Sequence, residues 1–394
     1  MALVVAGVLL LGGGEEPYVA RIGDAAPTGP TDGDVAAVVA ALGRAIDAHD
    51  PATAAALGVD PTAGERLAQL ARNADAADLG VSLRLLDRIG GVAPDGTVAV
   101  STEVRWRYRG VDRAEARAEM QVQVRGAPGA GATVVTVGGG DLATPIWAAG
   151  PISVSAEGGV LVVAQQPRDP AGYLPLARRA VPQVAAVVSG WSRSFVLEVP
   201  ADAAALESTL DVEPGYYTQI AAVTGSPDGV NSATSPIHIL LNPEVFDGLG
   251  TAARQVVLTH ELAHLATRAP RSGSPLWLIE GFADYVALRD TTLPLATTAR
   301  QIAARVRADG VPRALPSAAD FDTRGPHLGA VYEGAWLLCV TIADRAGQDG
   351  LVALYDAVDA GADPARALRR AAGWSEAQLL GAWQQRLRSL PGAG

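Results

Sequence analysis

The sequence is poor in several residue types that usually carry function. Its 394 residues include one cysteine, Cys339, which excludes an intramolecular disulfide and a cysteine-based zinc site. Lysine is absent, so all 31 basic residues are arginine. Acidic residues outnumber them and give a net charge of −11. This balance argues against nucleic acid and anionic membrane surfaces as partners.

The chain begins with an apolar stretch that is too short for a membrane span. Residues 1–12 are apolar, whereas a spanning helix needs about 20 such residues. They also lack the basic leading segment of a signal peptide. We interpret residues 1–30 as the remnant of a signal or membrane anchor, followed by a polar linker. This predicts an extracellular or cell-surface-anchored protein, and a buried first strand is the alternative.

Histidine is scarce as well, with five in the chain, yet two of them form the run His260-Glu261-x-x-His264 in an apolar, helix-like stretch. On a helix, residues four apart lie on the same face, about 6 Å apart along the axis. Both ring nitrogens can then bind one metal ion at roughly 2.0–2.1 Å. Glu261 could take a proton from a water on that metal. The alternative is an amphipathic helix with two packed core histidines.

A second apolar, periodic segment covers residues 276–287, after Pro270, where we expect the first helix to stop. In it, Glu280 and Asp284 share one helix face and lie among apolar neighbours. A buried carboxylate is unfavourable there unless it is paired or binds a metal. We therefore predict Glu280 as the third ligand and Asp284 as the acceptor of a ligand histidine's free N–H. For Glu280, a solvated first-turn position is the alternative.

These residues resemble a known enzyme class. The pattern His260-Glu261-x-x-His264 followed by Glu280-x-x-x-Asp284 resembles the gluzincin zinc peptidases, the class of thermolysin and aminopeptidase N. The phrase at 277–285 is most similar to the branch called peptidase MA-like. Two features differ: the spacer between His264 and Glu280 is shorter, and the Gly-x-Met-Glu-Asn element of aminopeptidases is absent. Exopeptidase activity of that kind is therefore not supported.

The resemblance, which covers roughly residues 160–390, implies further roles. Tyr332 lies in a segment similar to the peptidase MA-like one in which a tyrosine faces the metal. Its hydroxyl would donate to the oxyanion that forms during hydrolysis. His327 is the alternative donor, and Tyr332 could also be a plain helix-start tyrosine. By the same resemblance, the strand Ile237–Asn242 would be the sheet edge that pairs with an extended substrate.

The remaining pattern predicts an α+β fold. Short helices up to residue 72 precede several alternating, β-rich segments, with Ile146–Ser155 and Val160–Ala164 as the last strand pair. This order is similar to a nuclear-transport-factor-2-like (NTF2-like) cone, and we predict such a helix-plus-antiparallel-sheet domain at 31–155. Residues 156–394 are predicted to form a peptidase MA-like zinc domain with a mixed sheet and a helical C-terminal part.

Together these observations predict zinc-dependent hydrolysis of a peptide or protein substrate. A metal-activated water would attack the peptide bond, with Glu261 as general base and His260, His264 and Glu280 as ligands. Zn²⁺ suits this donor set, although Co²⁺ or Mn²⁺ would also accept three N/O ligands. The alternative function is a metal-binding but weakly active or inactive module for binding or sensing at the cell surface.

Overall fold

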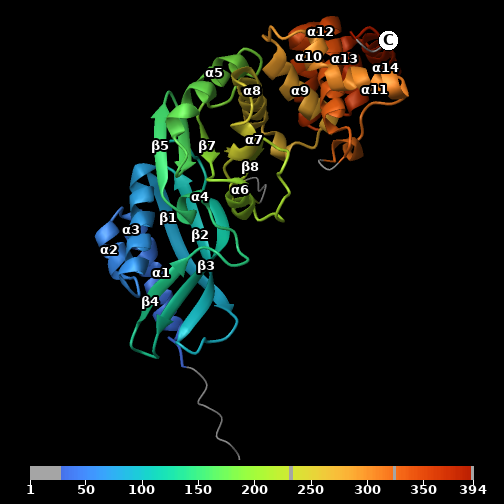
Figure 1. The fold of residues 1–394 in the computed structure, drawn as a ribbon. Coiled ribbons are helices and arrows are strands. Elements are labelled where there is room, and N and C mark those ends of the chain that lie inside the picture. The colour runs from blue at the N-terminus through green and yellow to red at the C-terminus, as the bar shows by residue number, and fades with distance from the viewer. Residues whose placement is uncertain (1–27, 230–233, 323–324, 392–394) are drawn as a thin grey trace, which may run out of the picture.

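A computed structural model of the chain describes residues 28–229, 234–322 and 325–391 (Figure 1). The apolar start that was predicted as a signal or anchor lies outside the described residues. Within the described ranges, no helix combines the length and the apolar character that crossing a membrane requires.

Three helices and a four-stranded sheet form the first part of the chain. Apolar residues on α1 and α3 pack against inward-facing residues of β1–β4 and close the first hydrophobic core. Neighbouring strands are antiparallel, in the order β1-β2-β3-β4. The elements are α1 (Asp32–Asp47), α2 (Pro51–Ala56), α3 (Pro61–Ala76), β1 (Leu79–Ile89), β2 (Thr97–Tyr108), β3 (Ala116–Gly126) and β4 (Ala132–Val137).

A five-stranded mixed sheet follows, in the order β5-β6-β7-β9-β8. The three inner strands are parallel to one another, and each outer strand is antiparallel to its neighbour. The strands are β5 (Ile152–Glu157), β6 (Val160–Gln165), β7 (Phe195–Val199), β8 (Ala222–Gly225) and β9 (His238–Leu241). The helices among them are α4 (Ile146–Ala149), η1 (Pro170–Gly172), α5 (Leu174–Ala185) and α6 (Ala203–Leu210).

The sequence-based assignment of the last strand pair was wrong in two respects. The β5–β6 hairpin belongs to the second sheet, so the first sheet contains four strands among the described residues. In addition, Ile146–Ser155 is not one strand, because its first residues form the short helix α4. Pro145 precedes that helical turn, which buries Trp147 in the first core, and Gly150 follows it. The strand starts only at Ile152.

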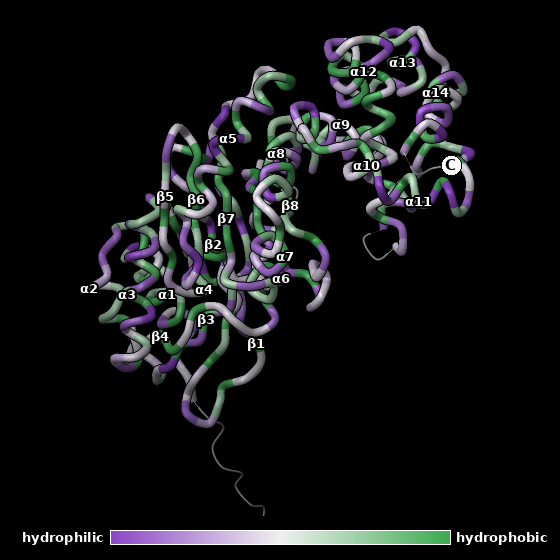
Figure 2. Tube along the Cα trace, turned by 45° about the horizontal axis from the view of Figure 1, so that its top comes forward, coloured by the Kyte–Doolittle hydropathy of each residue, from purple (hydrophilic) through white to green (hydrophobic). Residues whose placement is uncertain are grey.

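The three inner strands of the second sheet are buried on both faces. Along β6 and β7 the side chains alternate: Val162 and Leu197 enter a second core, whereas Leu161, Val163 and Val196 enter the first. Successive strand residues point to opposite faces, so a strand with core on both sides is apolar throughout. In Figure 2 the trace along β6 and β7 is largely green, the colour of hydrophobic residues. The two cores therefore share one sheet.

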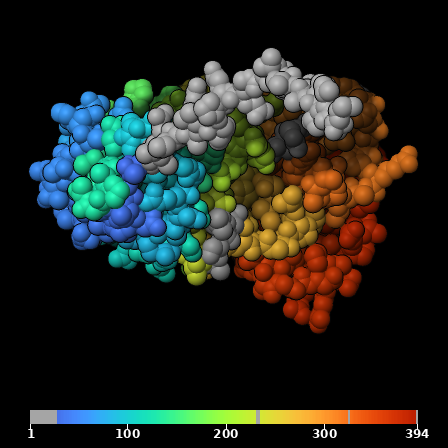
Figure 3. Space-filling view, turned by 90° about the horizontal axis from the view of Figure 1, so that it is seen from below, coloured from blue at the N-terminus to red at the C-terminus, as the bar shows by residue number. Residues whose placement is uncertain are grey.

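Helices dominate the chain after β9. α8 packs on α5 and β8, and α9 packs between α8 and α12. The first and last parts of the chain lie at opposite ends of the molecule (Figure 3). The elements are α7 (Pro243–Phe246), α8 (Thr251–Thr267), η2 (Ala269–Arg271), α9 (Leu276–Leu288), α10 (Leu295–Thr298), α11 (Arg300–Asp309), η3 (Ala318–Phe321), α12 (Leu328–Asp359), α13 (Pro364–Ala372) and α14 (Glu376–Arg388).

The predicted fold class is confirmed: an antiparallel sheet with helices precedes a mixed sheet and a helical C-terminal part. Inside α12 the helical backbone is interrupted at Gly347, which has a φ of 78°. The finer comparison with an NTF2-like cone, and the boundary between the two predicted domains, stay predictions.

Candidate metal centre

The predicted helix around the two histidines is α8, and its apolar face attaches it to the second sheet. Leu258, Leu262 and Ala263 are buried in the second core. His260 and His264 lie one turn apart, so their rings project side by side at 4.5 Å between centroids. The helix ends at Arg268, whose left-handed backbone (φ 56°) turns the chain into η2. That turn leads the chain back as α9 beside the histidines.

Three predicted ligands converge between α8 and α9. The Nε2 atoms of His260 and His264 are 2.9 Å apart. Glu280 Oε2 lies 3.3 Å from the first of these nitrogens and 3.2 Å from the second. All three side chains are largely buried, with exposed fractions of 11–15%. The structure thus brings together the residues that the sequence selected, from two helices that are separated by a loop.

The spacing of these three atoms fits one small divalent cation. Ligand atoms at the corners of a tetrahedron, each roughly 2.0–2.1 Å from a zinc ion, lie about 3.3 Å from one another. The observed separations of 2.9, 3.2 and 3.3 Å are close to that value. Among the described residues, these three side chains alone form a cluster of histidine, cysteine or carboxylate groups with this convergence. The donor set of two imidazoles and one carboxylate suits Zn²⁺.

Asp284 orients one of the imidazoles. Its Oδ1 lies 2.7 Å from Nδ1 of His260, on the side of the ring away from Glu280. A neutral ring that donates its Nδ1 proton to Asp284 keeps a lone pair on Nε2, which is the form that binds a metal. Asp284 therefore occupies the position that was predicted for it.

The site as a whole favours positive charge. Burial alone would lower the pKa of His260, but the carboxylates of Asp284 and Glu280 raise it well above its ordinary value. Burial would likewise raise the pKa of Glu280, yet the two imidazoles hold it far below its usual range. Glu280 is thus ionised at neutral pH, as a ligand must be. A divalent cation bound here would likewise offset the negative charges of Asp284 and Glu280.

Glu261 lies on α8 between the two histidines and is about nine-tenths buried. One of its carboxylate oxygens, Oε2, is 2.7 Å from the hydroxyl of Thr224 on β8. Thr224 also lines a cavity of about 310 Å³ that reaches His264 and Glu280, with Leu276 and Ile279 as apolar walls. The candidate general base therefore lies next to a cavity that adjoins the candidate ligands. Sequence reasoning missed Thr224, because nothing in its local sequence marks it.

Tyr332, near the start of α12, lies beside the centre. Its ring centroid is 6.3 Å from that of His260, and the ring of Phe321 packs edge-on against it at 5.5 Å. Burial and the nearby carboxylates raise the pKa of Tyr332, so its hydroxyl stays protonated and able to donate. His327, the alternative donor, is an exposed residue at the N-cap of α12.

The prediction that Ile237–Asn242 forms the edge of the sheet is wrong, because its strand, β9, is an inner strand. β9 lies between β7 and β8 and is buried along its length, so β8 is the outer strand beside α8. His238, on β9, is fully buried, with its ring nitrogens 3.1 Å from Glu198 and 3.0 Å from Asp112. Tyr108 donates to the same Glu198 oxygen. His238 thus connects the second sheet to Asp112, between β2 and β3, and is not part of the cluster of candidate metal ligands.

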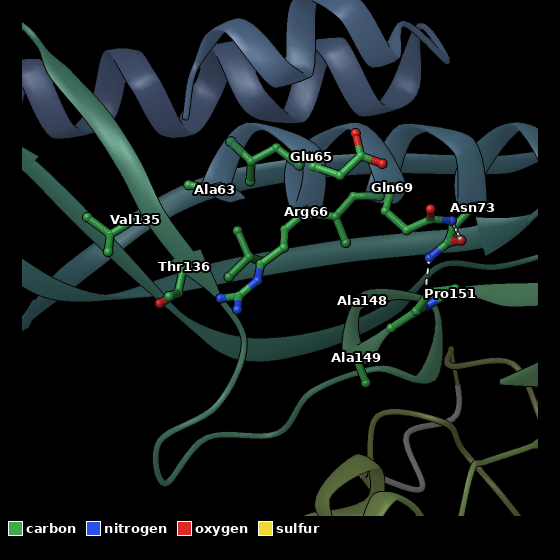
Figure 4. Close-up of a pocket in the computed structure, with 14 residues that line it drawn as sticks. Ala63, Glu65, Arg66, Gln69, Asn73, Val135, Thr136, Ala148, Ala149 and Pro151 are labelled. Atoms are coloured by element: carbon green, nitrogen blue, oxygen red, sulfur yellow. Dashed lines mark hydrogen bonds between the residues drawn. The ribbon is translucent and has the colours of Figure 1, made fainter. Parts of the chain in front are cut away.

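A separate cavity of about 490 Å³ lies in the first part, between α3, β4 and the segment that leads into β5 (Figure 4). The Arg66 side chain extends into it toward Thr136. The amide of Asn73 donates to the carbonyl oxygens of Trp147 and Gly150. The Asn73 side chain therefore links α3 to the main chain around α4, and we assign no ligand to this cavity.

Two comparisons with known proteins were negative. No protein-family model matches the chain, and no curated protein matches it at a significant level. The resemblance to gluzincins thus rests on the motif residues alone, and the chemistry must be inferred from the geometry of the centre.

Proposed function

We propose that the protein is a zinc-dependent peptidase of the gluzincin type. The observation that carries this proposal is the convergence of His260, His264 and Glu280 at 2.9–3.3 Å from one another, with Glu261 beside them. His260, His264 and Glu280 would hold the zinc ion and would leave room for a water on it, as three protein ligands do in catalytic zinc sites. Zinc in such a site supplies a Lewis acid and makes water acidic enough to lose a proton near neutral pH.

The residues around the centre have complementary roles in this proposal. Glu261 accepts the proton of the attacking water and later passes it to the departing amine. The hydroxyl of Tyr332 donates a hydrogen bond to the scissile carbonyl oxygen as that oxygen gains negative charge. Asp284 fixes the tautomer of His260 and so keeps Nε2 free for the metal.

A polypeptide substrate suits the sheet edge beside α8. An extended peptide can add to an exposed strand through main-chain hydrogen bonds. β8 is the outermost strand of the second sheet among the described residues, and it contacts the helix that carries Glu261. A substrate paired with β8 would therefore run past the general base. This strand takes the role that the sequence had assigned to Ile237–Asn242.

The decisive experiment combines metal analysis with digestion of a peptide library. The purified chain is expected to contain about one zinc per molecule and to cleave a subset of peptides. Glu261→Gln should retain zinc and lose cleavage, whereas His264→Ala should lose both. Glu376→Gln, which alters an exposed glutamate at the start of α14, serves as the matched control and should change neither.

The outcomes separate the possible functions. Bound zinc without cleavage of any peptide by the unaltered chain would refute the peptidase and favour a binding or sensing module. Absence of zinc after reconstitution would refute the metal centre itself.

A further inference from the structure

Thr224 makes a close side-chain contact to the proposed general base. Its hydroxyl oxygen is 2.7 Å from Oε2 of Glu261 and 2.9 Å from the main-chain carbonyl oxygen of the same residue. A hydroxyl has one proton to donate. The shorter contact leads to the ionisable oxygen, and hydrogen bonds to charged acceptors are the stronger ones. Donation to the carboxylate is therefore favoured over donation to the carbonyl.

The main chain of Thr224 faces away from β9, toward the outer edge of the sheet as the described residues form it. In an antiparallel pair, the residues of a strand alternate between bonding the neighbouring strand and turning their N–H and C=O groups away from it. Asn242 N donates to Ala221 O, which sets the phase of this ladder. Val223 and Gly225 consequently bond β9, whereas Ala222 and Thr224 direct their main-chain groups outward. A peptide that added to β8 would pair with those outward groups.

We infer that Thr224 is a positioning residue that couples the substrate to the general base. Its hydroxyl holds one oxygen of Glu261 in place, so that the other oxygen is left to exchange protons. Its main-chain groups bind the substrate strand. One residue thus sets both the orientation of the base and the register of the peptide. The inference rests on the proposed peptidase function, because only then does the orientation of Glu261 affect a rate.

Removal of the hydroxyl should affect turnover more than binding. Thr224→Val keeps the shape and the main-chain groups of the residue but leaves the Glu261 carboxylate without this donor. Since a displacement of about 1 Å at a catalytic group can reduce a rate roughly 100-fold, we expect kcat to fall by about 10–100-fold. KM and zinc content should stay within about twofold. Thr224→Ser restores the donor and should return kcat to within about threefold of the unaltered enzyme.

Thr209→Val is the matched control for loss of a buried threonine hydroxyl. Thr209 is 2% exposed, and its hydroxyl is 2.9 Å from the carbonyl oxygen of Ala205 and 3.1 Å from that of Thr144. The first contact lies within α6, and the second links α6 to the segment just before α4. We expect this variant to lower the melting temperature while kcat is unchanged. If Thr224→Val behaved in the same way, its hydroxyl would be structural and the inference would be overturned.

Crystal structures of the zinc-loaded unaltered chain and of Thr224→Val give a readout that does not depend on activity. The inference expects one Glu261 rotamer within hydrogen-bond distance of Thr224 in the first structure and a different or disordered carboxylate in the second. An unmoved carboxylate in the variant would refute the inference alone, even if the enzyme cleaves peptides. A carboxylate that moves in a chain without activity would instead refute the proposed function and leave the positioning contact established.

Discussion

The close packing of α9 on α12 should depend on the absence of a side chain at Gly281, and the substitution Gly281→Ala tests this. A Cβ atom built on Gly281 would lie 2.2 Å from the carbonyl oxygen of Ala335 and 3.0 Å from Sγ of Cys339. The first contact is with main chain of the facing helix, which cannot rotate away. The two helices would have to separate to accept the methyl group.

The expected magnitude follows from two opposing contributions. Alanine is favoured over glycine in a helix interior by about 1 kcal/mol. Overpacking a core typically costs about 1–3 kcal/mol, and contact with rigid main chain belongs at the upper end of that range. The net loss in the free energy of unfolding should therefore be about 2 kcal/mol. With a denaturant slope of about 3 kcal/mol/M, the urea midpoint would fall by roughly 0.7 M.

Gly381→Ala provides a matched control in α14. Gly381 is exposed, and a Cβ atom there would have no neighbour within 4 Å. The same substitution should thus raise the free energy of unfolding by about 0.5–1 kcal/mol. Because Gly281 follows Glu280, the proposed third ligand, only Gly281→Ala should also weaken zinc binding. An unchanged or raised urea midpoint for Gly281→Ala would refute the packing argument.

Three further substitutions test other parts of the structure. Asp284→Asn should weaken zinc affinity by about 10–100-fold in a chelator competition titration, and unchanged affinity would show that the orienting contact is dispensable. Tyr332→Phe should lower kcat by roughly 100–1,000-fold on a cleaved peptide, whereas His327→Ala should not; the reverse result would make His327 the donor. His238 should stabilise the fold in its charged form. Burial alone would lower the pKa of His238, but the carboxylates of Asp112 and Glu198 raise it from 6.5 to about 10. This stabilisation is complete below pH 6.5 and is lost as the pH rises toward 10, so the urea midpoint should fall over that interval, and His238→Gln should flatten the slope.

The site could be predicted from the sequence where the chemistry depends on local geometry. The spacing of His260 and His264 placed two rings on one helix face, and the same periodicity placed Glu280 above Asp284. These relations follow from a 3.6-residue turn and need no knowledge of the fold. The convergence of the two helices was the long-range part of the prediction, and the structure agrees with it.

The order of the strands could not be predicted from local patterns. β9 follows β8 in the sequence but lies inside it in the sheet, where it pairs in parallel with β7. A short apolar strand has the same appearance in either position, so the edge was assigned to the wrong strand. Thr224 was missed for the same reason, since its contact with Glu261 joins two residues that are 37 positions apart in the sequence.

The shared sheet has a consequence for how this molecule could be divided. A fragment that starts after the first four strands would present the apolar side of β6 and β7 to water, because Leu161, Val163 and Val196 are covered by the other half of the chain. Such an uncovered face invites self-association. The portion that bears the proposed metal ligands is therefore not expected to fold as a separate unit. A fragment made to carry this portion should therefore also include α1–α3 and β1–β4.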